Sequence, residues 1–311
     1  MKTNFTKKIL KLSFEIEYRL LIIVTKLPFV RLVRNLFILR GIINLILDRD
    51  WRQLIQAGSV RRRTSHALGS CSWGIASLKR FIAYSLEESD MFLLRESGPT
   101  KKELDSLKKS CRRQLEHLTD RSSVVISYHF GSFILGILAL SALNRPIYVL
   151  GSSIVESPKL PPALHEFFKK KYEIMERYLN GGEILFVEES NKMKNFFRYL
   201  SNGAIGVAMG DLLAGDNSSS IDLTIFNIRA KVQAGLPVFA KKRAIPIATY
   251  LCRRKLIGEP IFRATATIES DKNISQTIQD LFEEIIDTDT FNQDLWLIAD
   301  SFQHLRKDRK L

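Results

Sequence analysis

The stretch SSVVISYHFGSFILGILALSAL, residues 122–143, decides how the chain folds. Its first part, SSVVISY (122–128), is a run of β-branched and aromatic residues that is typical of a buried strand. Its second part, FILGILALSAL (133–143), predicts a helix. His129 lies between the two parts, at the carboxyl end of the strand, and Gly131 opens the helix. The position of His129 is where a reactive group would be held.

Beyond this stretch, short β-branched runs alternate with helical stretches. The sequence predicts strands at 146–152, 183–189, 204–211, 220–226, 245–251 and 261–269, and helices at 161–182, 193–203 and 229–243. Alternation of this kind favours right-handed crossovers and an α/β fold with a largely parallel, twisted sheet and helices on both faces. Ligands bind to such sheets beyond the carboxyl ends of the strands.

The first 120 residues have a helical pattern throughout. Amphipathic helices are predicted at 4–26, 29–48, 64–90 and 101–118. Thr100, followed three residues later by Glu103, predicts a capping box at the start of the last helix. We therefore expect a helical region at 1–120 and an α/β core at 121–311, joined in one continuous globular unit.

Positive charge is concentrated near the amino terminus. The chain has a net charge of +14, and residues 1–63 contain fourteen Lys and Arg against four Asp and Glu. Apolar clusters broken every few residues by a cation are typical of a helix that lies on an anionic membrane surface. The alternative is an ordinary surface helix with solvated cations. We expect membrane association of the helical region.

Transmembrane, disulfide-linked, zinc-binding and nucleic-acid-binding proteins fit the sequence less well. The longest uninterrupted apolar run near the amino terminus, Leu20 to Val24, is far shorter than the roughly 18–20 residues of a transmembrane helix. Cys71, Cys111 and Cys252 are odd in number and far apart, which argues against a disulfide framework or a zinc site. We see no nucleic-acid recognition motif and expect no nucleic-acid partner.

Three blocks resemble a known family, the lysophospholipid acyltransferase superfamily, and within it the bacterial lipid A biosynthesis acyltransferases that transfer lauroyl and myristoyl chains. HFGSF (129–133) is similar to the family's HFGNWE block, and AMGD (208–211) to its acidic block after a strand. FNIRAKVQAGLPVFAKKRAIPIATYL (226–251) is similar to a later helix and strand of the family. A late Trp296 also fits. The resemblance covers about half of the chain and implies a glycerol-3-phosphate acyltransferase-like fold.

The resemblance also implies a chemistry. Family members use an HX4D/E pair, in which His is the general base on the acceptor hydroxyl and the acid orients the imidazole. His129 matches the base, but Ile134 occupies the position of the acid. An arginine that the family tends to carry after the second strand is also absent from VLGSSIVESPKL (149–160).

Three hypotheses for the absence of the family's acid remain open. In the first, an active enzyme orients His129 through another group: Asp211 is the best candidate, followed by Glu188 and Asp216, while Ser132 or a backbone carbonyl is a further option. In the second, His129 works without an acid on a more nucleophilic acceptor such as an amine. In the third, the protein is a non-catalytic lipid-binding or scaffold paralogue.

We assign catalytic roles to His129, Asp211 and Ser132. Substrate-binding roles are expected for Phe130, Gly131, Phe133, Ile134, Ser152 and Arg229. The expected reaction transfers a fatty acyl group from a thioester, on an acyl carrier protein or coenzyme A, to a hydroxyl or amine of a lipid, glycolipid or metabolite. We expect no metal and no bound cofactor, and the resemblance implies a location on the cytoplasmic face of a bacterial inner membrane.

Overall fold

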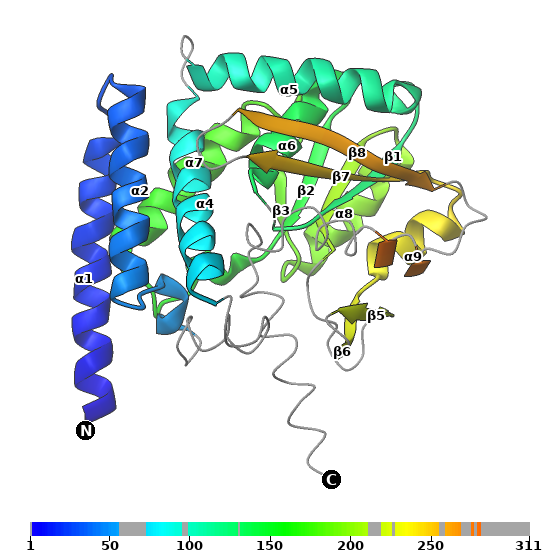
Figure 1. The fold of residues 1–311 in the computed structure, drawn as a ribbon. Helices are drawn as coiled ribbons and strands as arrows, with labels where there is room; N and C mark the ends of the chain where they lie inside the picture. Colours follow the sequence, from blue (N-terminus) through cyan, green and yellow to red (C-terminus); the bar gives the residue numbers. More distant parts are fainter. Residues whose placement is uncertain are drawn as a thin grey trace.

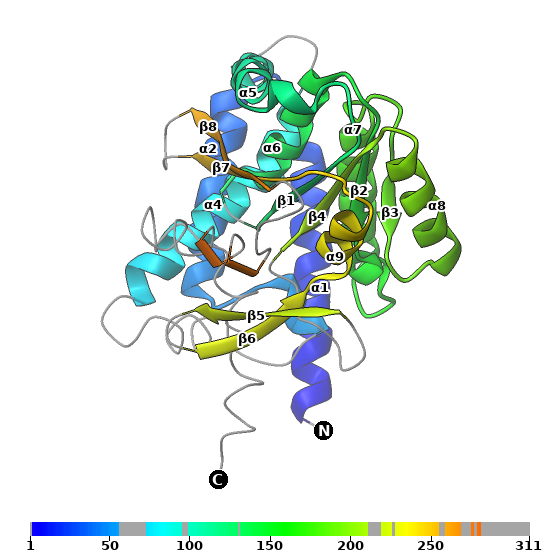
Figure 2. The same ribbon diagram turned by 90° about the vertical axis from the view of Figure 1, so that its right-hand side faces the viewer.

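The computed structural model shows a sheet between two layers of helices, with two long amino-terminal helices beside one layer (Figures 1 and 2). The structure describes residues 2–55, 73–94, 99–129, 131–210, 219–225, 228–254, 259–268, 275–276 and 279–280. The α/β class and the placement of helices on both faces of the sheet are therefore confirmed.

Six strands form the main sheet. Their spatial order is β3 (Ile184–Phe186), β2 (Ile147–Gly151), β4 (Ile205–Met209), β1 (Ser123–Ser127), β7 (Ile247–Arg254) and β8 (Pro260–Ile268). Neighbours are parallel except β7 and β8, which pair antiparallel. The largely parallel sheet is thus confirmed. A separate antiparallel pair consists of β5 (Ser220–Ile225) and β6 (Ile228–Gln233).

Strand β1 lies in the interior of the sheet, and its two serines are buried together with its three apolar residues. All five of its residues are buried, as expected for a parallel strand covered on both sides. It pairs with β4, where Ser127 lies opposite Met209, and with β7, where Val124 lies opposite Ile247. The strand that carries His129 is therefore held on both edges.

Helices cover both faces and bury a separate apolar cluster on each. One face carries α4 (Trp73–Leu93), α5 (Pro99–Leu115), α6 (Phe133–Ala139) and α7 (Pro162–Glu176). The other face carries α8 (Ser190–Ser201) and α9 (Gly235–Lys242). Short 3-10 helices connect elements: η1 (Trp51–Leu54), η2 (Glu116–Leu118), η3 (Leu140–Leu143) and η4 (Ser153–Glu156).

The two amino-terminal helices belong to the same packed unit. Helix α1 (Lys2–Val24) lies against α7, and α2 (Val30–Ile46) lies against α4. Tyr18 is fully buried, with its ring 5.0 Å from that of Phe167. The backbone amide of Ala163, at the start of α7, donates a hydrogen bond of 2.9 Å to the Glu15 carboxylate. Apolar packing therefore continues from the sheet to α1.

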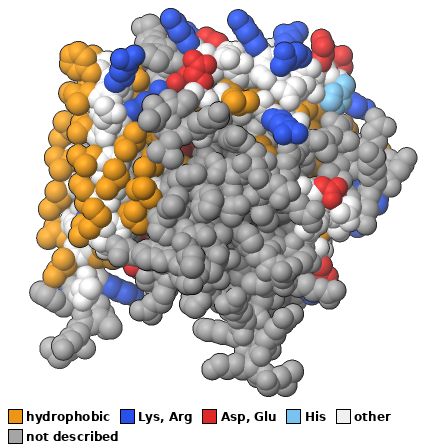
Figure 3. Space-filling model, in the orientation of Figure 1, with side chains coloured by type: hydrophobic (Ala, Val, Ile, Leu, Met, Phe, Trp, Pro, Cys, Tyr) orange, Lys and Arg blue, Asp and Glu red, His pale blue; other side chains and the backbone are white. Residues whose placement is uncertain are grey.

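The outer sides of α1 and α2 are also apolar. Of the fifteen exposed large apolar side chains among the described residues, eleven lie between residues 9 and 47. We call them the α1–α2 apolar face: Ile9, Leu12, Ile16, Leu20, Ile23, Phe29, Leu32, Leu39, Ile43, Ile46 and Leu47. They form a continuous patch at one side of the molecule (Figure 3). Among the described helices, none combines the length and the apolar character needed to cross a membrane.

The predicted helix at 229–243 is wrong in its first half. Residues Ile228–Gln233 form strand β6, and the helix begins only at Gly235. The strand shows the period of two that a half-buried strand requires, since Lys231 and Gln233 are exposed while Val232 is buried. Pairing with β5 decides the conformation of this segment.

The predicted capping box at Thr100 and Glu103 is also wrong. Helix α5 already includes Pro99, and the Thr100 hydroxyl accepts a hydrogen bond of 3.2 Å from Arg34 on α2. The Glu103 carboxylate likewise accepts two hydrogen bonds from Arg34, of 2.9 and 2.7 Å. Thr100 and Glu103 therefore bind Arg34 on another helix and do not cap their own helix.

We expect Gly182→Ala to destabilise the fold by about 2 kcal/mol or more, because a Cβ there would lie 1.8 Å from the carbonyl oxygen of Ile147, a backbone atom of β2. Gly235→Ala is the matched control, since a Cβ at the start of α9 meets nothing within 4 Å. Urea unfolding followed by circular dichroism measures both. Equal stability of the two variants would contradict the close approach at Gly182.

Candidate functional site

The turn between β1 and α6, residues 128–132, carries His129. Tyr128 is buried against the sheet, whereas His129 is partly exposed at the carboxyl end of the strand. Gly131 has a φ of +58°, in the left-handed region that residues with a Cβ adopt only at a cost. This conformation turns the chain from β1 into α6. It leaves His129 at the carboxyl end of β1, as the sequence predicts.

The side chains that follow His129 are apolar. The Phe133 ring meets the imidazole edge to face, with 4.9 Å between ring centroids. Ile134, at the position of the family's acid, is only 5% exposed and packs in the apolar cluster on the α6 face. The structure therefore places Phe133 beside His129 and Ile134 in the core.

Ser132 has partners inside the fold. Its backbone amide donates a hydrogen bond of 2.9 Å to the Cys252 carbonyl on β7, so this amide already has an acceptor inside the fold. Its hydroxyl oxygen accepts a hydrogen bond of 3.2 Å from Nε of Arg254. A serine hydroxyl that accepts from a guanidinium keeps its own proton to donate. Ser132 thus connects the turn to Arg254.

Arg254 belongs to a buried ionic cluster of four residues, Arg34, Asp90, Glu103 and Arg254. Nη2 of Arg254 donates to Asp90 at 2.7 Å and to Glu103 at 2.9 Å. Nη2 of Arg34 donates to the same two carboxylates, at 3.0 and 2.7 Å. The Asp90 side chain is 1% exposed and that of Arg254 is 7% exposed. The formal charges of the ionic cluster cancel, which is the condition under which buried charges are tolerated.

The two carboxylates of the ionic cluster differ in electrostatics. Burial raises the pKa of Asp90 above its ordinary value, although both guanidiniums oppose this effect. Burial also acts to raise the pKa of Glu103, but hydrogen bonds from Arg34 and the charge and hydrogen bond of Arg254 outweigh it and lower that pKa. Glu103 therefore holds its negative charge more firmly than Asp90.

Helix α4 supplies further buried acids that the sequence analysis missed. Glu87 accepts a hydrogen bond of 2.6 Å from Lys171 on α7, and Glu88 pairs with Arg40 on α2. The signal is the run EESD at 87–90, since four successive polar residues cannot all lie on the solvent side of a helix. Such a run inside an apolar helix predicts cations on its neighbours.

Ser152 and Glu188 lie together, away from His129. The Ser152 hydroxyl donates to the Glu188 carboxylate at 2.7 Å, and the Ser153 amide donates to its other oxygen at 3.0 Å. Partial burial acts to raise the pKa of Glu188, but these hydrogen bonds outweigh it and lower that pKa. Glu188 follows β3, which is three strands from β1, or about 14 Å at the usual strand spacing. Glu188 therefore serves Ser152 rather than His129.

Several predicted site residues lie outside the described part of the chain: Phe130, Asp211 and Asp216, and the side chain of Arg229. The backbone of Arg229 belongs to β6, opposite Thr224. Gly210, the residue before Asp211, donates its amide to the Ser127 carbonyl at 2.7 Å. The chain thus leaves β4 beside the strand end that leads to His129.

The comparisons with known proteins assign neither a family nor an activity to the chain. No protein-family model matches the chain, and no curated protein matches it significantly. Among the residues that the structure describes, no group of three or more His, Cys, Asp and Glu side chains is arranged to hold a metal ion.

We expect Arg254→Met to lower the free energy of unfolding by about 3–5 kcal/mol, because two buried carboxylates then share one guanidinium. Arg243→Met, at the exposed end of α9, is the control and should cost less than about 0.5 kcal/mol. Urea unfolding at pH 7 measures both. Equal losses in the two variants would show that the ionic cluster contributes no more than surface charge.

Proposed function

We propose that the protein is an acyltransferase of the lysophospholipid or lipid A type, with His129 as its general base. The donor is an acyl thioester of a carrier protein or of coenzyme A, and the acceptor is a hydroxyl or amine of a lipid, glycolipid or metabolite. The observation that carries the proposal is the position of His129, partly exposed at the carboxyl end of an interior parallel strand and just before a helix. Reactive groups of open α/β sheets occupy this place.

The proposed reaction needs one base and no bound cofactor. The imidazole takes the proton of the acceptor as the acceptor oxygen or nitrogen attacks the thioester carbonyl. The tetrahedral intermediate then releases the thiolate, which takes the proton back from the imidazolium. The products are the acylated acceptor and a free thiol, so atoms and charge balance.

Asp211 is the proposed orienting acid. The amide of Gly210 is bonded to the carbonyl of Ser127, so the segment leading to Asp211 starts beside the segment leading to His129. Glu188 does not compete, because it follows β3, which is three strands from β1 in the sheet. Ile134 cannot substitute, since its side chain is apolar and buried.

We expect His129→Ala to lower thioester cleavage by about 10²–10⁴-fold, the usual contribution of a general base. The assay follows release of thiol from a long-chain acyl-CoA and an acyl carrier protein thioester, with water or an added amine as acceptor. His117→Ala is the matched control, because His117 is an exposed histidine on η2. Full activity of the His129 variant would overturn the proposal.

The same assay separates the remaining readings. Loss of activity in Asp211→Asn supports the orienting role, whereas unchanged activity assigns orientation to another group or to none. Tight binding of a labelled acyl chain without any thiol release by the unmodified protein would favour the non-catalytic lipid-binding paralogue.

The proposal includes an anionic membrane surface as the place of reaction, on the cytoplasmic face of a bacterial inner membrane. The α1–α2 apolar face provides the area to insert, and exposed cations stand beside it at Lys7, Lys8, Lys26 and Arg31. Each exposed cation near anionic headgroups contributes about 1 kcal/mol. Not every amino-terminal cation is available, because Arg34, Arg40 and Arg49 form ion pairs inside the fold.

We expect the double substitution Ile16→Asp, Leu20→Asp to reduce binding to phosphatidylglycerol vesicles at least tenfold, because both side chains lie in the α1–α2 apolar face and are more than half exposed. Co-sedimentation measures the bound fraction. Ile261→Asp, at an equally exposed site on β8, should leave binding unchanged. Equal binding by all three proteins would exclude this face as the contact.

A further inference from the structure

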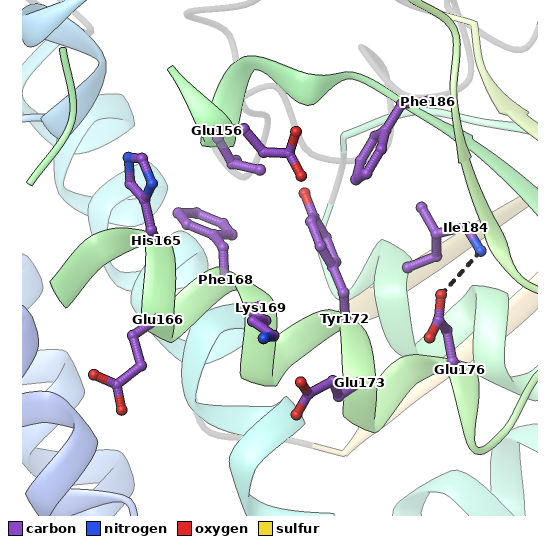
Figure 4. A pocket seen from close by; sticks show the side chains of 11 residues that line it. Glu156, His165, Glu166, Phe168, Lys169, Tyr172, Glu173, Glu176, Ile184 and Phe186 are labelled. Carbon is purple, nitrogen blue, oxygen red and sulfur yellow. Dashed lines mark hydrogen bonds between the residues drawn. The ribbon is translucent and has the colours of Figure 1, made fainter. Parts of the chain in front are cut away.

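A cavity of about 600 Å³ lies away from His129, between η4, α7 and β3. Its wall includes the aromatic rings of Phe168, Tyr172 and Phe186, with Val155 and Ile184 beside them (Figure 4). Four glutamates, Lys169 and His165 complete the lining. None of its lining residues belongs to the turn that carries His129. The volume is in the range of sites that bind small molecules.

The three aromatic rings surround one side of the cavity at oblique angles. Tyr172 lies 6.2 Å from Phe168 with 44° between their planes, and 6.0 Å from Phe186 with 58° between their planes. An aromatic ring is electron-rich on its face and electron-poor at its edge, so a cation binds to the faces of such rings. Phe186 already attracts one cation from its own chain, because the Lys192 ammonium lies 5.9 Å from its ring centroid. Aromatic walls favour cationic ligands.

Carboxylates line the same cavity, in a chain whose net charge is +14. Glu166 is engaged by Lys170 at 2.5 Å, and Glu176 accepts the Ile184 amide at 3.3 Å. The side chains of Glu156 and Glu173 are exposed and form no ion pair or side-chain hydrogen bond with a described residue, although the charge of Glu156 acts on the Lys192 ammonium. The lining therefore holds four carboxylates, those of Glu156, Glu166, Glu173 and Glu176, against one ammonium, that of Lys169, beside the aromatic rings.

Tyr172 adds a hydrogen-bond donor. Its hydroxyl makes no hydrogen bond with a described residue, and it points toward the carboxylate of Glu156 at the far side of the cavity (Figure 4). Burial is the main reason that the pKa of Tyr172 lies above its ordinary value, so the phenol stays protonated. A ligand with an oxygen next to its charge would satisfy this donor.

We propose that this cavity binds an organic cation, an ammonium group carried on a small apolar body. The rings take the apolar body and the onium charge, Glu156 and Glu173 balance that charge, and Tyr172 donates to a neighbouring oxygen. An anion would be repelled by the carboxylates, and a neutral apolar molecule would gain nothing from them. The ligand class follows from the cavity alone and needs no acyl transfer.

The test compares choline with 3,3-dimethyl-1-butanol, its uncharged carbon isostere, on the chain of 311 residues. Benzyltrimethylammonium is a second and larger cation. Saturation-transfer NMR and calorimetry measure the dissociation constants. We expect saturable binding of at least one cation, and binding of choline at least about tenfold tighter than binding of the isostere, since cation–π contacts and the carboxylates attract the charged form only. Absence of binding by both cations, or equal binding of choline and its isostere, overturns the proposal.

Three variants locate the site. Glu156→Gln and Glu173→Gln should each weaken cation binding about threefold or more, and Tyr172→Leu about tenfold. Glu166→Gln is the matched control, because its carboxylate lines the same cavity but is already held by Lys170. The three Gln variants should unfold within a few degrees of the parent. Tyr172→Leu removes a partly buried ring and lowers stability, so Glu156→Gln and Glu173→Gln test the binding site independently of it. Binding that is unchanged in all variants overturns the assignment to this cavity.

The same chemistry occurs in free amines and in lipid headgroups. Dihexanoylphosphatidylcholine, used below its micellar concentration, carries the choline ammonium on a lipid. Tighter binding of this lipid than of choline identifies a headgroup as the ligand, whereas tighter binding of choline identifies a free cation, and both results support the site.

Discussion

Arg254 joins three helices to the sheet through one side chain. It extends from the end of β7 to Asp90 on α4, to Glu103 on α5 and to Ser132 before α6. Arg34 brings α2 to the same carboxylates. Apolar packing is non-directional and would tolerate small shifts of these helices along the sheet. Buried ion pairs do not permit such shifts, because the displacement of one charged side chain leaves the charge of its partner uncompensated. The ionic cluster therefore sets the positions of α2, α4 and α5 relative to the turn that carries His129.

Local pattern was sufficient to predict the α/β core. Strand β1 and helix α6 are unambiguous because β1 centres on three β-branched residues, α6 has no polar side chain, and a glycine separates them. The errors occur where a distant partner decides the outcome. Residues 229–233 have helix-compatible side chains, but pairing with β5 makes them a strand. Thr100 and Glu103 have the spacing of a cap, yet Arg34, more than 60 residues earlier, takes both side chains.

The site was predictable only in part. The position of His129 follows from the strand end, whereas the partners of Ser132, Ser152 and Glu188 depend on elements far away in the sequence. The amino-terminal cations show the same limit. A basic amphipathic pattern predicts cations on the outer side, but Arg34, Arg40 and Arg49 lie inside and apolar side chains cover the outside. Charge counted along a sequence does not reveal which side of a helix carries it.

The packing of α1 on α7 has a consequence for the order of synthesis. Glu15 and its partner Ala163 are 148 residues apart. At roughly 5–20 residues per second, a ribosome needs about 7–30 seconds to add the intervening chain. During that interval α1 lacks the helix that covers its inner side, while its outer side is apolar in any case. A nascent chain in this state exposes the apolar residues of both sides of the helix, so the time before α7 emerges is when aggregation competes most strongly with folding.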